Sequence, residues 1–320
     1  MIPLAPTARD IVLRDGSARL MRFHGHPEAQ STPLLIVPSL INKWYVLDLR
    51  PGASVVEALV GAGLDVFCLD WGVPRDEDRY LEWDDIVARL DRAVRRVRRL
   101  TGAGQVGLLG YSMGATLGAI EAALHPERVA ALVNLAGPID FSRSGLLRTL
   151  TDPRWFDAEA VAAAGNVHPA LVRGGLVALR PAAPVARWVR MLDHLDDPEA
   201  CEAFWAREIW FNDNVTFPAA VYGRFVRDLF QRNELVQGQH RIAGRPVDLS
   251  AIECPLLTIV AEDDEICPPQ AVLALGERTG SEQTEVLRIP GSHIGAVVGT
   301  GAAQTLYPAL SRWLRDTLCN

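Results

Sequence analysis

A serine between two glycines stands in the middle of the chain, in the segment Gly110-Tyr111-Ser112-Met113-Gly114. The apolar residues 106–109 precede it, and the small and apolar run MGATLGAIEAAL follows it. This pattern predicts a strand, a tight turn and a helix, with the serine at the turn. The glycines permit a cramped turn, and the helix N-terminus directs its N–H groups toward the serine side chain. We therefore predict that Ser112 is a nucleophile rather than a serine in an ordinary turn.

A histidine and an aspartate further along the chain could activate this serine. A serine is a weak nucleophile at neutral pH unless a base accepts its proton. His293, in IPGSHIG, is the only one of the seven histidines in a loop after a late predicted strand, so it is the candidate base. Asp263 and Asp264 in AEDDEICPP compete for the role of acid, and the offset from the strand end and the following ICPP favour Asp264. The order serine, aspartate, histidine along the chain is that of the α/β hydrolases.

Acyl transfer also needs N–H donors for the negatively charged oxygen of a tetrahedral intermediate. The amide of Met113, directly after the serine, is the first candidate. The second donor is expected from the loop VPSLINKWYVLDL, where the amides of Ser39 and Leu40 are candidates because Pro38 has no N–H. Alternatively, this segment is an ordinary strand-to-helix loop without an oxyanion donor, and the sequence does not decide between these two interpretations.

Composition and charge exclude several classes of protein. The net charge of -7 without a basic stripe argues against a nucleic-acid partner. The first residues, MIPLAPTARDIVLRDG, lack a signal-peptide pattern, and no apolar stretch approaches the roughly 20 residues of a membrane span, so we expect a cytoplasmic protein. The five cysteines are scattered and odd in number, which predicts neither disulfides nor a zinc site, and none stands in a nucleophile-like context. No cofactor or metal is predicted.

The chain alternates between strand-like and helix-like segments on either side of a helical stretch. A hairpin is predicted around Asp15-Gly16, and strands and helices then alternate as in a mostly parallel sheet with helices on both faces. No convincing strand is found over residues 139–245. We therefore predict an α/β-hydrolase core formed by residues 1–138 and 246–320, with residues 139–245 inserted as a helical cap.

Several stretches together resemble the polyhydroxyalkanoate synthase family, its class III-type catalytic subunits in particular. They extend over about residues 6–314 and are TPLLIVPS, INKWYVLDLRPG, GLDVFCLDWGVP, GYSMGATLGAIEAALHPERVAALVNLAGPIDF, GRPVDLSAIECP, AEDDEICPP and GSHIGAVVG. The most specific of these stretches are INKWYVLDLRPG and GRPVDLSAIECP.

The resemblance implies an α/β-hydrolase fold with a helical cap, a nucleophile at the turn, an acid in AEDDEICPP and a histidine in GSHIG. It supports Asp264 over Asp263. The chain departs from the family at Ser112, where these synthases typically carry cysteine. A thiolate suits exchange with thioesters, whereas a serine forms an oxygen ester that an activated histidine can pass to water.

Three functions follow from these patterns. The first is a serine hydrolase acting on hydroxyacyl esters, oligomers or polyester through Ser112, His293 and Asp264. The alternative is an acyltransferase that polymerises 3-hydroxyacyl groups, with coenzyme A thioesters as substrates and an accessory subunit or a second copy as possible partner. A granule-associated or regulatory protein without turnover is the third, and the complete set of serine, aspartate and histidine argues against it.

Overall fold

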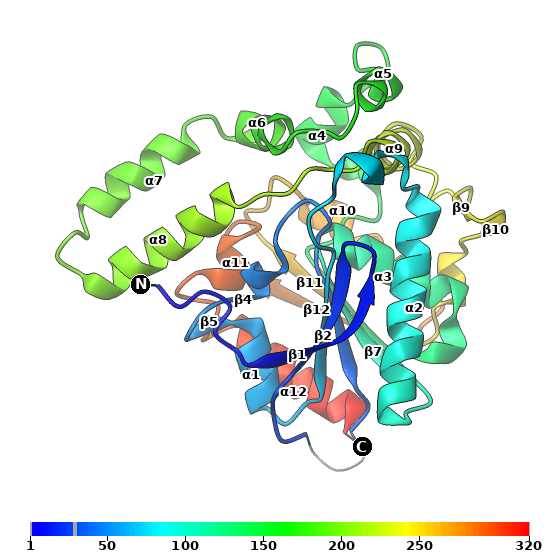
Figure 1. The fold of residues 1–320 in the computed structure, drawn as a ribbon, viewed down its shortest axis with the longest axis horizontal. Helices are drawn as coiled ribbons and strands as arrows, with labels where there is room; N and C mark the ends of the chain where they lie inside the picture. The colour runs from blue at the N-terminus through cyan, green and yellow to red at the C-terminus, as the bar shows by residue number, and fades with distance from the viewer. Residues whose placement is uncertain (1, 28–30, 320) are drawn as a thin grey trace.

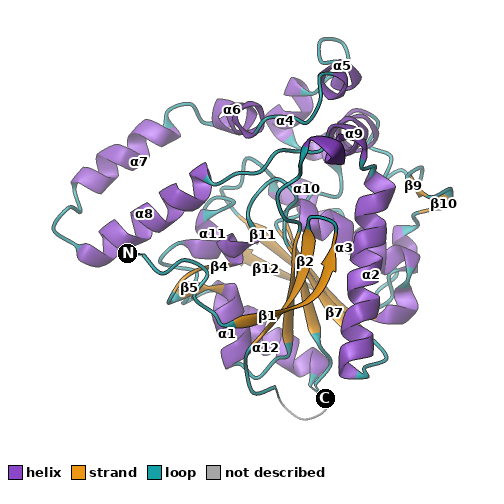
Figure 2. Ribbon diagram, in the orientation of Figure 1, coloured by secondary structure: helices purple, strands orange, loops and turns teal. Residues whose placement is uncertain are grey.

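The computed structural model describes residues 2–27 and 31–319, and an eight-stranded sheet runs through its centre (Figures 1 and 2). The strand order is β1-β2-β6-β3-β7-β8-β11-β12. The first two strands pair antiparallel with each other and β2 pairs antiparallel with β6, while the other neighbours are parallel. The strands of this sheet are β1 (Arg9–Asp15), β2 (Ala18–Phe23), β3 (Leu34–Val37), β6 (Val66–Asp70), β7 (Val106–Tyr111), β8 (Val129–Leu135), β11 (Leu256–Ala261) and β12 (Thr284–Ile289).

The central strands are apolar because helices cover both of their faces. Every residue of β3, β7 and β11 is buried, whereas the edge strands β1 and β12 are partly exposed. Continuous apolar runs of this kind are typical of parallel strands buried on both sides. One face packs on α2 (Trp83–Thr101) and α3 (Met113–Leu124), and the other on α1 (Val55–Gly61) and α12 (Leu306–Leu318).

The segment between β8 and β11 is mostly helical and lies at one end of the sheet. Figure 1 shows α7 and α8 as a pair, with α8 on the side of the core, where it contacts β4, and α7 on the outer side. The α-helices of this segment are α4 (Gly145–Leu150), α5 (Ala158–Ala163), α6 (Pro169–Leu179), α7 (Ala183–Leu192), α8 (Pro198–Asn212) and α9 (Ala219–Arg224), followed by the π-helix η5 (Phe225–Gln231). A helical cap was expected here, but the structure adds a short hairpin across its predicted end, β9 (Arg241–Ile242) with β10 (Arg245–Pro246). Strands of two residues leave no alternating pattern to detect.

Shorter elements connect these parts. They are the hairpin β4 (Asp48–Arg50) and β5 (Ala53–Ser54), the helices α10 (Pro269–Leu273) and α11 (Gly295–Val298), and the 3-10 helices η1 (Trp44–Leu47), η2 (Asp76–Tyr80), η3 (Pro126–Arg128), η4 (Phe141–Arg143) and η6 (Leu249–Ala251). Among the described residues, no helix combines the length and apolar character needed to cross a membrane.

Candidate active site

Ser112 occupies a strained backbone position between β7 and α3. Its φ of 56° and ψ of -129° lie in a region that residues with a side chain rarely adopt. The amide of Ser112 donates a hydrogen bond to the carbonyl oxygen of Leu135 at the end of β8 (2.9 Å). The next residue, Met113, begins α3, so the helix N-terminus faces the serine. This is the geometry of a nucleophile elbow.

The two glycines of the motif are needed for close packing. A Cβ atom at Gly110 would lie 2.2 Å from the Cα atom of Ala115, and one at Gly114 would lie 2.0 Å from the carbonyl oxygen of Val37. Neither glycine has a positive φ, so the cramped turn predicted from the sequence requires them for space rather than for backbone freedom. Gly114 lets α3 approach the end of β3, and the loop that carries Ser39 therefore lies beside the elbow.

His293 and Asp264 are in direct contact. The Nδ1 atom of His293 lies 2.6 Å from Oδ2 of Asp264. The other oxygen of Asp264, Oδ1, accepts hydrogen bonds from the amides of Ile266 and Cys267, both at 2.9 Å. The side chain of Asp264 is buried, whereas neighbouring Asp263 is exposed. The structure thus brings Asp264, and not Asp263, to the histidine.

Tyr111 holds the imidazole from one side. Its ring stacks on His293 with centroids 5.1 Å apart, and its hydroxyl donates a hydrogen bond to the carbonyl oxygen of His293 (3.3 Å). Burial lowers the pKa of His293, but the interactions with Tyr111, Asp264 and Cys267 together outweigh burial and raise the pKa well above its ordinary value. Because Nδ1 is engaged by the carboxylate, Nε2 is the nitrogen left to exchange a proton with a nucleophile.

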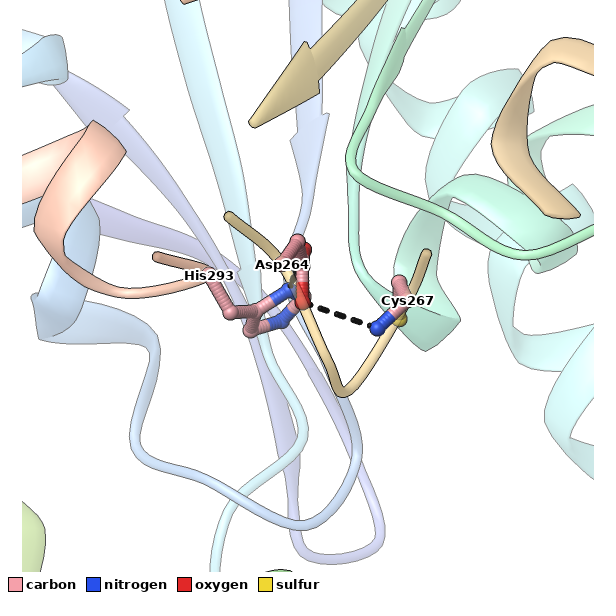
Figure 3. A group of neighbouring side chains, drawn as sticks. All are labelled: Asp264, Cys267 and His293. Atoms are coloured by element: carbon pink, nitrogen blue, oxygen red, sulfur yellow. Dashed lines mark hydrogen bonds and ion pairs between the residues drawn. The ribbon is translucent and has the colours of Figure 1, made fainter. Parts of the chain in front are cut away.

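Cys267 is the residue that the sequence analysis missed. The sequence places none of the cysteines in a nucleophile-like context, whereas the structure brings the thiol of Cys267 close to His293 and Asp264. Its sulfur lies within 4.8 Å of both a ring nitrogen of His293 and a carboxylate oxygen of Asp264. Figure 3 shows these three side chains together. The signal available in the sequence was its position three residues after Asp264, in a loop that folds back on its own carboxylate.

The predicted oxyanion donors fall in different places. Ser39 and Met113 line the same cavity as Ser112, whereas the side chain of Leu40 packs into the hydrophobic core, and the amide of Leu40 stays a candidate donor. The hydroxyl of Ser39 is buried without a hydrogen-bond partner among the described residues. Sequence reasoning considered only the backbone amide of Ser39, so this hydroxyl is a second polar group that it did not anticipate.

Two cavities meet at Ser112. The smaller, of about 190 Å³, also contains His293 and is bordered by Trp210 and Phe211 of α8. The larger, of about 390 Å³, is mostly apolar, and its aromatic lining comes from the segment between β8 and β11: Phe156, Phe217, Tyr222, Phe225 and Phe230.

The aromatic residues of the cap have two different roles. The sequence left open whether they line an acyl pocket or form the cap's own core. Phe156, Trp210 and Phe211 line the cavities at Ser112, whereas Trp188 and Trp205 pack on each other with ring centroids 5.6 Å apart. The first three therefore border the space at Ser112, whereas Trp188 and Trp205 are exposed and line neither of these two cavities.

An ion pair joins the cap to the loop that carries the acid. Arg180, directly after α6, contacts Glu265 with 2.6 Å between Nε and Oε2. Both residues border the smaller cavity, and Glu265 follows Asp264 directly. The pair is half-exposed, so it positions the cap over the site more than it stabilises the fold.

Comparison with known proteins places these features in a family. A family profile described as the alpha/beta hydrolase fold matches residues 32–300, and one described as the poly-beta-hydroxybutyrate polymerase (PhaC) N-terminus matches residues 3–59. The poly(3-hydroxyalkanoate) polymerase subunit PhaC of Allochromatium vinosum is 35% identical over 301 residues, which cover 93% of this chain and 84% of that protein. The corresponding subunit of Haloferax mediterranei is 34% identical over 98% of this chain and 65% of its own length.

Solved structures agree on the fold. Est1E from Butyrivibrio proteoclasticus matches with a TM-score of 0.58 and 13% identity, over 98% of this chain and all of that one. A thioesterase domain from the curacin biosynthetic pathway matches with a TM-score of 0.54 and 14% identity, over 97% and 99% of the two chains. The fold expected from the sequence is confirmed, and the chain belongs to the poly(3-hydroxyalkanoate) polymerase family within the α/β-hydrolase fold.

Proposed function

We propose that this protein is an acyltransferase that polymerises 3-hydroxyacyl groups taken from coenzyme A thioesters. The observation that carries the proposal is the identity of 35% with a poly(3-hydroxyalkanoate) polymerase subunit along 93% of this chain. The contact between His293 and Asp264 beside the elbow supports it, because it supplies the base that acyl transfer from a thioester requires.

In the proposed reaction, Oγ of Ser112 attacks the thioester carbonyl while Nε2 of His293 accepts the hydroxyl proton. The intermediate collapses, the C–S bond breaks, and the thiol of coenzyme A leaves with that proton. The hydroxyl of a second hydroxyacyl unit then attacks the ester on Ser112, and His293 moves its proton to the serine oxygen. Asp264 keeps the imidazole in the productive tautomer, and the amides of Met113 and Ser39 stabilise the oxyanion.

The shape of the site favours transfer to an alcohol over transfer to water. The larger cavity beside Ser112 has predominantly apolar walls and can hold an acyl chain. An acyl chain in this cavity displaces water from the ester, so an incoming hydroxyacyl group competes better as acceptor. We propose that the first units of the growing chain occupy it.

Hydrolysis is the second candidate, and the identity of the nucleophile favours it. A serine forms an oxygen ester, and His293 can activate water to cleave that ester as readily as it activates an alcohol. The product would then be a free hydroxy acid, and the same residues would be needed.

The partner is a further part of the proposal. The curated relatives are named as polymerase subunits. Many large apolar side chains that are exposed in this structure lie on the helical segment, among them Val185, Trp188, Leu192, Trp205 and Ile209. Exposed apolar surface concentrated in one region is typical of an interaction site. We propose that this face binds either a second copy of the chain or an accessory subunit.

Release of coenzyme A from 3-hydroxybutyryl-CoA tests the proposed substrate class. We expect continuous release by the purified protein, and Ser112→Ala should slow the steady-state rate of release by several orders of magnitude because the nucleophile is lost. The p-nitrophenyl ester of butyrate serves as the comparison substrate. Turnover of the p-nitrophenyl ester without release of coenzyme A would favour an esterase instead.

A further inference from the structure

The thiol of Cys267 shares the immediate surroundings of the candidate nucleophile. It lies within 4.8 Å of a ring nitrogen of His293, and Cys267 lines the larger cavity together with Ser112 and Met113. The backbone of Cys267 is held in place, because the amide of Cys267 donates a hydrogen bond to Oδ1 of Asp264 (2.9 Å). Figure 3 shows Cys267 and Asp264 on one loop, with His293 against the carboxylate.

The surroundings of this thiol shift its pKa in both directions. Burial and the Asp264 carboxylate raise the pKa of Cys267, while His293 and Ser112 beside it lower the pKa. The net direction is upward, so the group rests as a neutral thiol and needs a base, as Ser112 does. A thiol that has a base is nonetheless the stronger nucleophile toward a thioester.

We infer that Cys267 is a second acyl-accepting nucleophile, which shares the base His293 with Ser112. The identity of the acyl donor in this inference rests on the proposed function. The position of the thiol beside the imidazole and at the cavity wall does not.

The reaction is a thioester exchange. The sulfur of Cys267 attacks the carbonyl carbon of a hydroxyacyl thioester, and Nε2 of His293 accepts the thiol proton. A new C–S bond forms, the C–S bond to coenzyme A breaks, and the departing thiolate takes the proton from His293. One thioester and one thiol are consumed and one of each is produced, so no oxidant, reductant or water is needed.

A simpler role for Cys267 is packing. It contacts Val260 and Val272 in a small apolar cluster, and only 4% of its surface is exposed. A packing residue would gain nothing from lying beside His293 and would be replaceable by valine without effect on chemistry. The two roles therefore differ in their dependence on the histidine and on the acyl donor.

Acyl labelling separates the two roles. Wild type, Ser112→Ala, Cys267→Val and the double variant are incubated with 3-hydroxybutyryl-CoA and examined by intact-protein and peptide mass spectrometry. We expect Ser112→Ala to retain one hydroxybutyryl group on Cys267, removable by neutral hydroxylamine, and the double variant to carry none. Cys68→Val, a change at a fully buried core cysteine, is the control and should label as wild type does.

Label on Ser112 in wild type with none on Cys267 in Ser112→Ala would overturn the inference and leave the proposed function standing. If no variant is labelled and no coenzyme A is released, the proposed function fails. The inference is then decided by alkylation of Cys267 with iodoacetamide, which needs no acyl donor. We expect His293→Ala to slow alkylation at Cys267 at least tenfold and to leave Cys68 unchanged, whereas an equal rate in both proteins would show a packing thiol.

Discussion

At the scale of single residues, the site depends on how one imidazole is held. Asp264 binds Nδ1 of His293 at 2.6 Å, and Tyr111 stacks on the ring from the β7 side. The aspartate is itself fixed by two amides of its own loop. These contacts leave Nε2 as the only nitrogen that can serve a nucleophile, which is the arrangement that acyl transfer needs.

Replacement of the acid tests this arrangement. Asp264→Asn should lower kcat roughly 10³-fold or more, because the amide favours the wrong tautomer of His293. Asp263→Asn is the matched control at the neighbouring exposed position and should change kcat less than about twofold. The rate of coenzyme A release measures both. A large loss of kcat in Asp263→Asn with little change in Asp264→Asn would show that Asp263 is the acid.

The pH dependence of activity follows from the surroundings of His293. The imidazole must be neutral to accept a proton, and its pKa is raised well above the ordinary value of 6.5. Activity should therefore be low at acidic pH, rise as the imidazole loses its proton, and level off only above that raised pKa. A profile of kcat/KM against pH measures this, and a midpoint at or below 6.5 would contradict the geometry described above.

At the scale of elements, α3 carries both the elbow and a buried acid. Glu121 is fully buried in this helix, and neither carboxylate oxygen has a hydrogen-bond partner among the described residues. Burial raises its pKa to about 8, and the negative charge of Asp91 adds to that shift. The folded protein therefore holds this proton at pH values where the unfolded chain has lost it.

The stability of the protein should fall with rising pH because of Glu121. Below pH 4.5 both states are protonated, and between 4.5 and about 8 only the folded state retains the proton, so the free energy of unfolding declines over this range. Over this pH range, the free energy of unfolding of wild type should fall by roughly 4 kcal/mol more than that of Glu121→Gln. Urea unfolding at pH 5 and pH 8.5 measures the difference, with Glu127→Gln as an exposed control. Equal pH dependence in wild type and Glu121→Gln would show that the carboxylate is solvated.

How much of this could be predicted depends on the range of the interactions. The central strands, α2 and α3 follow from local apolar periodicity, and the strand-to-helix context of Ser112 follows with them. The position of Cys267 beside His293 depends on packing between two loops that are far apart in the sequence, and the burial of the Ser39 hydroxyl depends on packing between the loop after β3 and α3. Such contacts join residues by tertiary packing, so sequence patterns alone did not reveal them.

At the scale of the whole molecule, a helical cap closes over one end of a parallel sheet and encloses an apolar space at the elbow. The ion pair between Arg180 and Glu265 connects the cap to the acid loop. The cavity is shaped by elements from both parts of the chain, since the loop after β3, α3 and the helical segment all contribute to its walls. This arrangement supports the proposal that the acceptor of the acyl group is another hydroxyacyl unit.

The products formed from 3-hydroxybutyryl-CoA test that proposal most directly. Purified protein is incubated with this thioester, coenzyme A release is followed, and the acyl products are separated by size and identified by mass spectrometry, with Ser112→Ala as the control that lacks the proposed nucleophile. We expect ester-linked oligomers or polymer of 3-hydroxybutyrate that accumulate in step with coenzyme A. Release of coenzyme A with free 3-hydroxybutyrate as the only product would contradict it and would make the protein a hydrolase.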